Sequence, residues 1–99
     1  MKLESVGLAG TMESSDISVT IEPKSTEGIE IILKSPVENQ FGKQIRKVIE
    51  DTLKELGVFS ATVRANDKGA LDCTIKARVQ TAAYRAAGLS EYKWGEDVK

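Results

Sequence analysis

The chain has 99 residues, which is enough for one domain with a single modest core. Its 14 basic and 15 acidic residues give a formal net charge of −1, so it lacks the basic surplus with which nucleic-acid-binding proteins neutralise phosphate. It has no histidine and one cysteine, which excludes Ser–His and Cys–His catalytic pairs and argues against an enzyme that acts alone.

Cys73 is the single cysteine, so no disulfide can form within the chain. A lone thiol is typical of a reducing compartment. The sequence shows neither an apolar run long enough to span a bilayer nor a signal peptide with a basic and then an apolar region. These features predict a cytoplasmic protein that has no membrane partner.

Residues 1–15 are expected to form a flexible N-terminal segment, because they offer little apolar material to pack. Apolar side chains then alternate with polar ones, at Ile17, Val19 and Ile21, which predicts a half-buried strand. Turn-forming residues at 22–28 separate it from a second alternating run over 29–34. The two predicted strands are expected to pair as an antiparallel hairpin.

A long helix is predicted over residues 36–56. Ser35 is expected to cap it, with Pro36 at its first position and Glu38 completing a capping box. Apolar residues follow at spacings of three and four, at Val37, Phe41, Ile45, Val48, Ile49, Leu53 and Leu56. Gly57 is expected to end the helix in a left-handed conformation.

Residues 58–65 predict a third strand, and the sequence Asn-Asp-Lys-Gly at 66–69 predicts a tight turn. Alternation over 71–79 predicts a fourth strand that pairs with the third. An alanine-rich run over 80–88 predicts a short helix, and residues 89–99 are expected to form a loose tail in which Trp94 could dock.

The predicted order of elements is therefore ββαββα. One apolar helix face and one apolar sheet face predict an α+β fold, a two-layer sandwich in which the long helix packs on a four-stranded sheet built from two hairpins. Residues 16–88 are expected to form this single domain.

Most candidate sites have a simple structural explanation. Cys73 lies in the alternating run over 71–79 and is interpreted as a buried apolar residue rather than a nucleophile. Glu50 and Asp51 lie near Lys47 and Lys54 on one helix and are interpreted as ion-pair partners. No metal site is predicted. The turn at 66–69 and the basic residues Lys76, Arg78 and Arg64 remain weaker candidates for binding surfaces.

Ser14 and Ser15 lie between Glu13 and Asp16, ahead of the first strand. They could be linker residues that form a local turn. A serine that must be modified by another enzyme, however, belongs on exposed and mobile backbone, and this segment has that character.

Four sequence blocks resemble the acyl carrier protein, or gamma subunit, of citrate lyase: AGTMESSD (9–16), SPVENQFG (35–42), NDKGALDC (66–73) and ARVQTAA (77–83). They occur in the same order over nearly the whole chain. The resemblance implies that Ser14 carries a covalent 2'-(5''-phosphoribosyl)-3'-dephospho-CoA group through a phosphodiester. Ser15 falls where the family accepts serine or glycine, so it is not the expected attachment point.

The resemblance also implies partners and a reaction cycle. Through the alpha subunit, citrate displaces acetate from the acetyl thioester on the arm and forms a citryl thioester. The beta subunit cleaves that thioester to oxaloacetate and the acetyl carrier. A prosthetic-group transferase loads the arm, and enzymes that activate acetate or citrate act on its thiol. The carrier itself has no catalytic residue. Because of their position on either side of the two serines, Glu13 and Asp16 are expected to help the transferase recognise the site.

Two alternatives remain open. The chain could be the carrier of a related complex such as malonate decarboxylase, which uses a similar arm. It could instead be a small non-catalytic module that binds a protein through its sheet face and the edge formed by Lys76 and Arg78.

Overall fold

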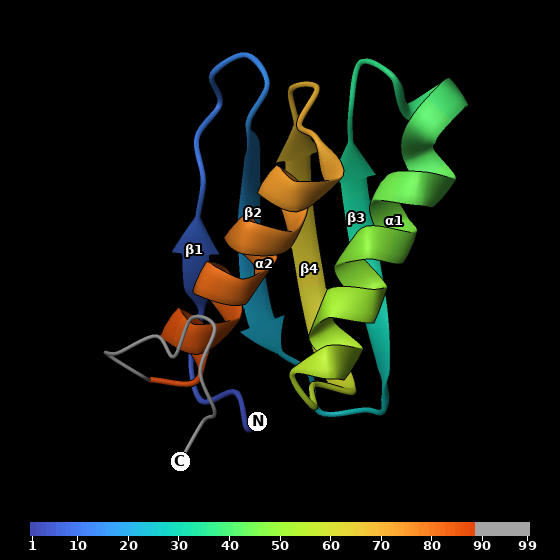
Figure 1. Cartoon of the computed structure of the whole chain (residues 1–99). Helices are drawn as coiled ribbons and strands as arrows, with labels where there is room; N and C mark the ends of the chain where they lie inside the picture. Colours follow the sequence, from blue (N-terminus) through green and yellow to red (C-terminus); the bar gives the residue numbers. More distant parts are fainter. Residues whose placement is uncertain (89–99) are drawn as a thin grey trace.

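The computed structural model describes residues 1–88; the predicted tail over 89–99 and the docking of Trp94 lie outside the described residues. Six elements follow in order: β1 (Gly7–Ala9), β2 (Ile17–Pro23), β3 (Gly28–Lys34), α1 (Glu38–Glu55), β4 (Ser60–Asp67) and α2 (Asp72–Ala86). The four strands form one sheet, and both helices pack on the same face of it (Figure 1). The predicted α+β fold with two layers and four strands is confirmed.

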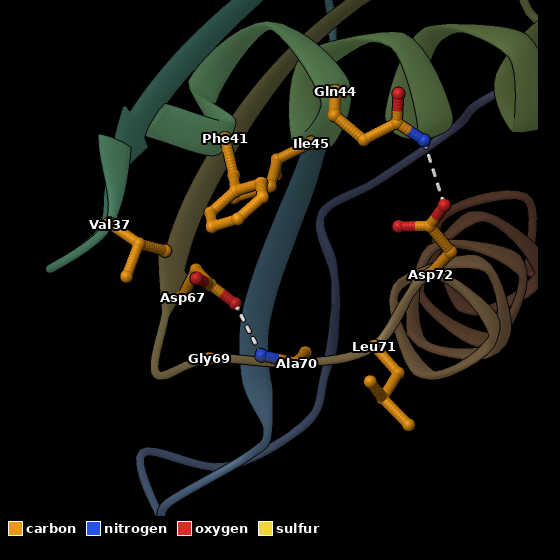
Figure 2. A pocket seen from close by; sticks show the side chains of 9 residues that line it. All are labelled: Val37, Phe41, Gln44, Ile45, Asp67, Gly69, Ala70, Leu71 and Asp72. Atoms are coloured by element: carbon orange, nitrogen blue, oxygen red, sulfur yellow. Dashed lines mark hydrogen bonds between the residues drawn. The ribbon is translucent and has the colours of Figure 1, made fainter. Parts of the chain in front are cut away.

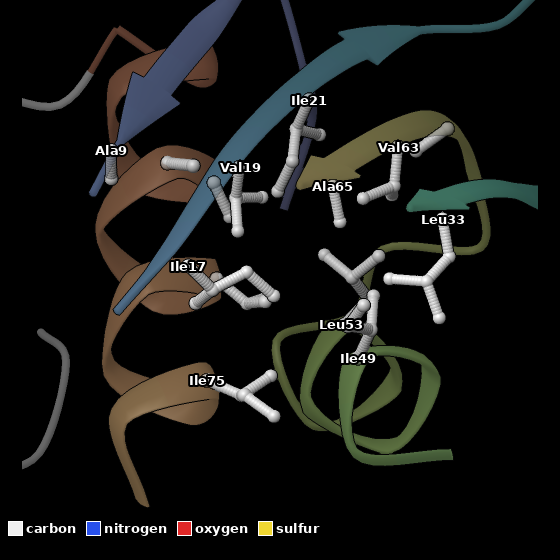
Figure 3. Close-up of a cluster of buried hydrophobic side chains, with 14 of the residues drawn as sticks. Ala9, Ile17, Val19, Ile21, Leu33, Ile49, Leu53, Val63, Ala65 and Ile75 are labelled. Carbon is white, nitrogen blue, oxygen red and sulfur yellow. The ribbon is translucent and has the colours of Figure 1, made fainter. Parts of the chain in front are cut away.

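The core lies between the sheet and the two helices. Figure 3 shows Ile17, Val19 and Ile21 of β2 on the same side as Ile49 and Leu53 of α1 and Ile75 of α2. All six of these side chains are fully buried. Because side chains alternate across a strand, the polar residues between the buried ones in β2 lie on the opposite, helix-free face of the sheet.

The predicted hairpin between the first two long strands is wrong. The strand order is β1-β2-β4-β3, so β4 lies between β2 and β3. It pairs antiparallel with β2 and parallel with β3. A parallel pair needs a crossover connection, and α1 supplies it, since its 18 residues span roughly 27 Å. The long helix is therefore the crossover that allows β4 to pair parallel with β3.

The predicted fourth strand over 71–79 is also wrong, because these residues form the first half of α2. Consequently the second predicted hairpin does not exist, and the short helix predicted over 80–88 is the end of a longer one. Ile75 and Val79 are four residues apart, a spacing that fits both a strand and a helix. Helical burial continues at Ala82, Ala83 and Ala86, whereas Leu71 and Cys73 are exposed.

Helix α1 begins two residues later than predicted, at Glu38, and its N-cap is Val37 with no side-chain hydrogen bond, so the predicted capping box of Ser35 and Glu38 is wrong. Ser35 still closes the preceding turn, because its hydroxyl accepts a hydrogen bond of 3.1 Å from the Val37 amide. Gly57 follows the helix with φ of +76°, which confirms the predicted left-handed residue at its end. The ion pairs expected on this helix are present as Lys47–Asp51 and Lys54–Glu50, at 2.9 and 3.2 Å.

Residues 1–15 are not irregular throughout, because Gly7–Ala9 form the edge strand β1, which pairs antiparallel with β2. Gly7 allows this strand to lie against α2: a Cβ atom there would lie 2.0 Å from the carbonyl oxygen of Ala82. Only glycine permits so close an approach of two backbones. The segment before the first long strand is therefore held to the folded body through β1, which pairs with β2 and lies against α2.

Candidate functional site

The connection between β1 and β2 contains the adjacent serines Ser14 and Ser15, and we call residues 10–16 the serine loop. It lies at the same end of the molecule as the turn between β4 and α2 (Figure 1). Ser14 is exposed. Within residues 1–88, the hydrogen bonds that shape the loop leave the Ser14 side chain unused.

The carboxylate of Asp16 accepts the hydrogen bonds that hold the serine loop together. Arg78 of α2 donates to both of its carboxylate oxygens, from Nε and Nη2, at 2.9 Å each. The Thr11 hydroxyl donates at 2.7 Å and the Thr11 amide at 3.2 Å to Oδ2, while the Ile17 amide donates at 2.7 Å to Oδ1. One carboxylate therefore joins the two ends of the loop to a helix 62 residues away.

The hydrogen bonds from Arg78 hold the pKa of the Asp16 carboxyl well below its usual range. Burial opposes this shift, and the Thr11 side chain and the Ile17 amide add to it. The side chain of Asp16 is 12% exposed and that of Arg78 is 40% exposed, so the pair lies at the edge of the body. Asp16 is consequently ionised at neutral pH.

Two backbone hydrogen bonds connect the loop to the turn after β4. The Ser15 amide donates to the Lys68 carbonyl and the Lys68 amide donates to the Asp16 carbonyl, each at 2.8 Å. Ser15 adopts φ of +67°, which is uncommon for a residue with a side chain. Gly10 has φ of +91°, and a Cβ there would lie 1.8 Å from the Ile17 carbonyl oxygen.

The two serines therefore differ although they are adjacent. Ser15 is the residue through which the loop backbone attaches to Lys68, whereas Ser14 precedes that attachment and presents a free hydroxyl. The arrangement can hold out an acceptor for a modifying enzyme at a defined place. Among residues 1–88, no group of three His, Cys, Asp or Glu side chains could hold a metal ion there or elsewhere.

Within the part of the chain that the structure describes, none of the other predicted candidates forms a hydrogen bond with the Ser14 side chain among those that shape the loop. Lys76 pairs with Glu55 at 3.4 Å, and Arg78 is occupied by Asp16. Cys73 is exposed in the first turn of α2 and not buried on a strand, so that interpretation is wrong. Glu13 is exposed in the loop, and its amide donates to the Thr11 hydroxyl at 3.2 Å.

Sequence reasoning missed the residues that shape the site. Thr11 and Arg78 were not recognised as partners of Asp16, because the three residues come from different parts of the chain. The sequence predicts that Asp67 lies in the turn at 66–69, yet it is the last residue of β4 and is 1% exposed. Its carboxylate accepts hydrogen bonds from the Ser35 hydroxyl at 2.8 Å and the Ala70 amide at 2.9 Å. Because burial is a property of the folded chain, the sequence carries no signal that identifies Asp67.

A pocket of about 430 Å³ lies beside the turn at 66–69, to which the serine loop is hydrogen-bonded (Figure 2). Apolar side chains of α1, of its N-cap residue and of the segment between β4 and α2 line most of it: Phe41, Ile45, Val37, Ala70 and Leu71. Asp67 and Asp72 add two carboxylates, and Gln44 donates to Asp72 at 2.8 Å.

Known proteins are similar to this chain in sequence and in fold. Residues 4–86 match the family described as malonate decarboxylase delta subunit (MdcD). The citrate lyase acyl carrier protein of Streptococcus mutans is 58% identical over 96 residues, which are 97% of this chain and 94% of that protein. The chain belongs to the citrate lyase acyl carrier protein family. The corresponding protein of Latilactobacillus sakei is 55% identical to this family member over 96 residues, which are 97% of this chain and 94% of that protein.

The fold of this acyl carrier has been seen in a solved structure. A chain of a Pseudomonas malonate decarboxylase hetero-tetramer in complex with malonate superposes with a TM-score of 0.68. The match covers 83% of this chain and 84% of that chain at 17% sequence identity, so it establishes the fold alone. Within the described residues, neither helix of the carrier is long and apolar enough to cross a membrane.

Proposed function

We propose that this protein is the acyl carrier subunit of citrate lyase and that Ser14 bears its covalent prosthetic group. The observation that carries the proposal is the contrast between an anchored loop and an unengaged hydroxyl at its exposed residue Ser14. The high identity to citrate lyase acyl carrier proteins supports the citrate assignment.

The residues present fit a phosphoribosyl dephospho-CoA group on Ser14. A phosphodiester needs an accessible hydroxyl, and Ser14 provides one without displacing any hydrogen bond that shapes the loop. When bound, the group supplies a terminal thiol that carries acyl groups as thioesters. Ser14 has no histidine to activate it, since the chain has none, so the base for the transfer must come from the transferase.

The carrier contributes position rather than catalysis. The ion pair of Asp16 with Arg78 and the backbone hydrogen bonds to Lys68 hold the loop in one place and leave Ser14 exposed. A flexible tether on such a fixed point raises the local concentration of the attached thiol to about millimolar. The alpha and beta subunits would each meet that thiol as a nearly intramolecular partner and supply the chemistry of citrate cleavage in the cytoplasm.

Carriage for malonate decarboxylase is the second candidate. It is favoured by the family description and by the fold shared with the Pseudomonas hetero-tetramer. Reconstitution with each set of partner subunits separates the two: the citrate assignment requires that the loaded carrier support citrate cleavage and not malonate decarboxylation.

The attachment site can be tested by intact mass after co-expression with the biosynthetic transferases. The wild-type chain should gain the mass of the group, and Ser14→Ala should not. Ser15→Gly is the matched control, because glycine accepts the φ of +67° at that position and should preserve the loop. Loading of Ser14→Ala, or loss of loading in Ser15→Gly alone, would contradict the assignment of Ser14.

A further inference from the structure

The helix-free face of the sheet has an uneven charge distribution. The strand register places Ser18, Asn66 and Lys34 in one row across β2, β4 and β3. The next row along the strands contains Thr20, Arg64 and Ile32, and the row after that contains Glu22, Thr62 and Glu30. The two basic residues therefore lie toward the strand ends that adjoin the serine loop, and the two acidic residues lie farther away.

A shallow hollow of about 400 Å³ occupies the basic part of this face. We call it the sheet hollow, and it is lined by Met12, Ser18, Thr20, Ile32, Lys34, Arg64, Ala65 and Asn66. Met12 belongs to the serine loop, two positions before Ser14, so one wall of the hollow is the loop itself. Met12 and Ile32 are large apolar side chains left 53% and 42% exposed.

We propose that the sheet hollow is a resting site for the nucleotide part of the arm carried by Ser14. The inference rests on the proposed function, because it requires the covalent group. That group contains adenosine and an anionic diphosphate, and its chemistry matches the hollow. Lys34 and Arg64 offer positive charge to the diphosphate. Met12 and Ile32 offer apolar surface to the adenine ring.

Arg64 is available for this contact despite its present partner. It pairs with Glu22 at 2.9 Å, and the two side chains are 54% and 35% exposed. An ion pair this open to water contributes little, so the guanidinium can turn to a phosphate at small cost. Lys34 is exposed at the end of β3.

The pocket on the other side of the sheet is a poorer host for the same group. Its lining includes the carboxylates of Asp67 and Asp72 and no basic residue. An anionic diphosphate would be repelled there. The charges therefore favour the sheet hollow, although both hollows adjoin the end of the sheet at which the serine loop lies.

Weak contacts are sufficient, because the nucleotide is tethered. At an effective concentration of about 1 mM, a site with a dissociation constant of about 1 mM is roughly half occupied. Such a site would hold the arm between transfers and release it readily to a partner subunit. Loss of two exposed ionic contacts should weaken docking about tenfold and lower the occupied fraction from about one half to about one tenth.

The test compares amide chemical shifts of the apo and loaded full-length carrier by heteronuclear NMR at low salt. Loading should shift the amides of Ser18, Thr20, Ile32, Lys34, Arg64 and Asn66, in addition to those of the loop. In Lys34→Gln/Arg64→Gln the sheet shifts should shrink about fivefold, following the occupied fraction. Lys43→Gln/Lys54→Gln is the control, because it changes net charge equally on α1 and should leave the shifts intact.

The outcomes separate this inference from the proposed function. A Ser14 adduct whose shifts remain within residues 10–16, or appear instead at Phe41 and Leu71, overturns the resting site and leaves the carrier role standing. Sheet shifts that are equal in both double variants also overturn it. Absence of any adduct on Ser14 overturns both, because the resting site has no occupant without the arm. Sheet shifts lost only in Lys34→Gln/Arg64→Gln support it.

Discussion

Arg78 and Asp16 form a two-point ion pair, with both hydrogen bonds 2.9 Å long, between helix α2 and the serine loop. The pair makes the position of Ser14 depend on a helix far away in the sequence. A mobile tail would leave the prosthetic group at a variable distance from the body, whereas this loop has a defined origin. The carrier thus presents an exposed hydroxyl on a loop whose position is fixed.

Removal of the Asp16 carboxylate should destabilise the fold. Asp16→Ala leaves Arg78, Thr11 and the Ile17 amide without their shared acceptor, and we expect the free energy of unfolding to fall by about 2 kcal/mol. Urea unfolding measures the change. Asp51→Ala is the control, since it removes an exposed carboxylate that pairs within one helix and should leave the midpoint unchanged. Equal effects of the two variants would rule out a special role for Asp16.

The same carboxylate should make stability depend on pH. Its ordinary pKa is 3.8, and the pKa in the folded protein is lower, so the unfolded chain binds the proton more readily. The contribution of Asp16 is therefore complete at neutral pH and is lost as the pH falls below about 4. The difference in unfolding free energy between wild type and Asp16→Asn should be constant from about pH 7 to 5 and smaller at about pH 3. A difference that stays constant through the acid range would contradict the pairing.

Two glycines with similar φ values should respond differently to alanine. Gly10 and Gly69 have φ of +91° and +89°, but only at Gly10 would a Cβ meet backbone, namely the Ile17 carbonyl oxygen. We expect Gly10→Ala to cost about 3 kcal/mol and Gly69→Ala about 1 kcal/mol. Thermal unfolding of the two variants checks this. Similar costs would mean that the start of the serine loop is not closely packed.

Hydrogen exchange should distinguish adjacent positions of the loop. The Ser15 amide donates to the Lys68 carbonyl and should be protected, whereas the amides of Met12 and Ser14 take no part in the hydrogen bonds of the loop and should exchange quickly. Protection is also expected within β1, which pairs with β2. Fast exchange throughout residues 1–15 would instead support a segment that is flexible as a whole.

Thiol titration should distinguish the apo carrier from the loaded carrier by the number of reactive thiols. Cys73 is the single cysteine and is exposed, so the folded apo protein should react with one equivalent of a thiol reagent without denaturant. A carrier loaded at Ser14 should react with two, because the arm ends in a thiol. The apo Cys73→Ser variant should not react at all. A native apo protein that reacts only after unfolding would place Cys73 inside the core.

Most of the elements could be predicted from local patterns. Helix α1 and strands β2, β3 and β4 follow from apolar spacings that hold within each segment, and the exposed serine follows from its polar surroundings. The proposal that Ser14 bears a prosthetic group rests on the resemblance to a family and not on periodicity. Helix α2 was missed because Ile75 and Val79 are compatible with either period, and the deciding burial at Ala82 and Ala83 occurs later in the chain.

Spacing along the chain thus indicated the conformation and the apolar side of α1, β2, β3 and β4, but not those of β1 and α2. Which strands pair, and which side chains meet, depended on contacts between residues far apart in sequence. The register that places Lys34 beside Asn66, and the approach of α2 that brings Arg78 to Asp16, arise only when the helices and the sheet share one core. A local pattern contains no information about such encounters, because the free energy that selects them comes from burial of all the elements together.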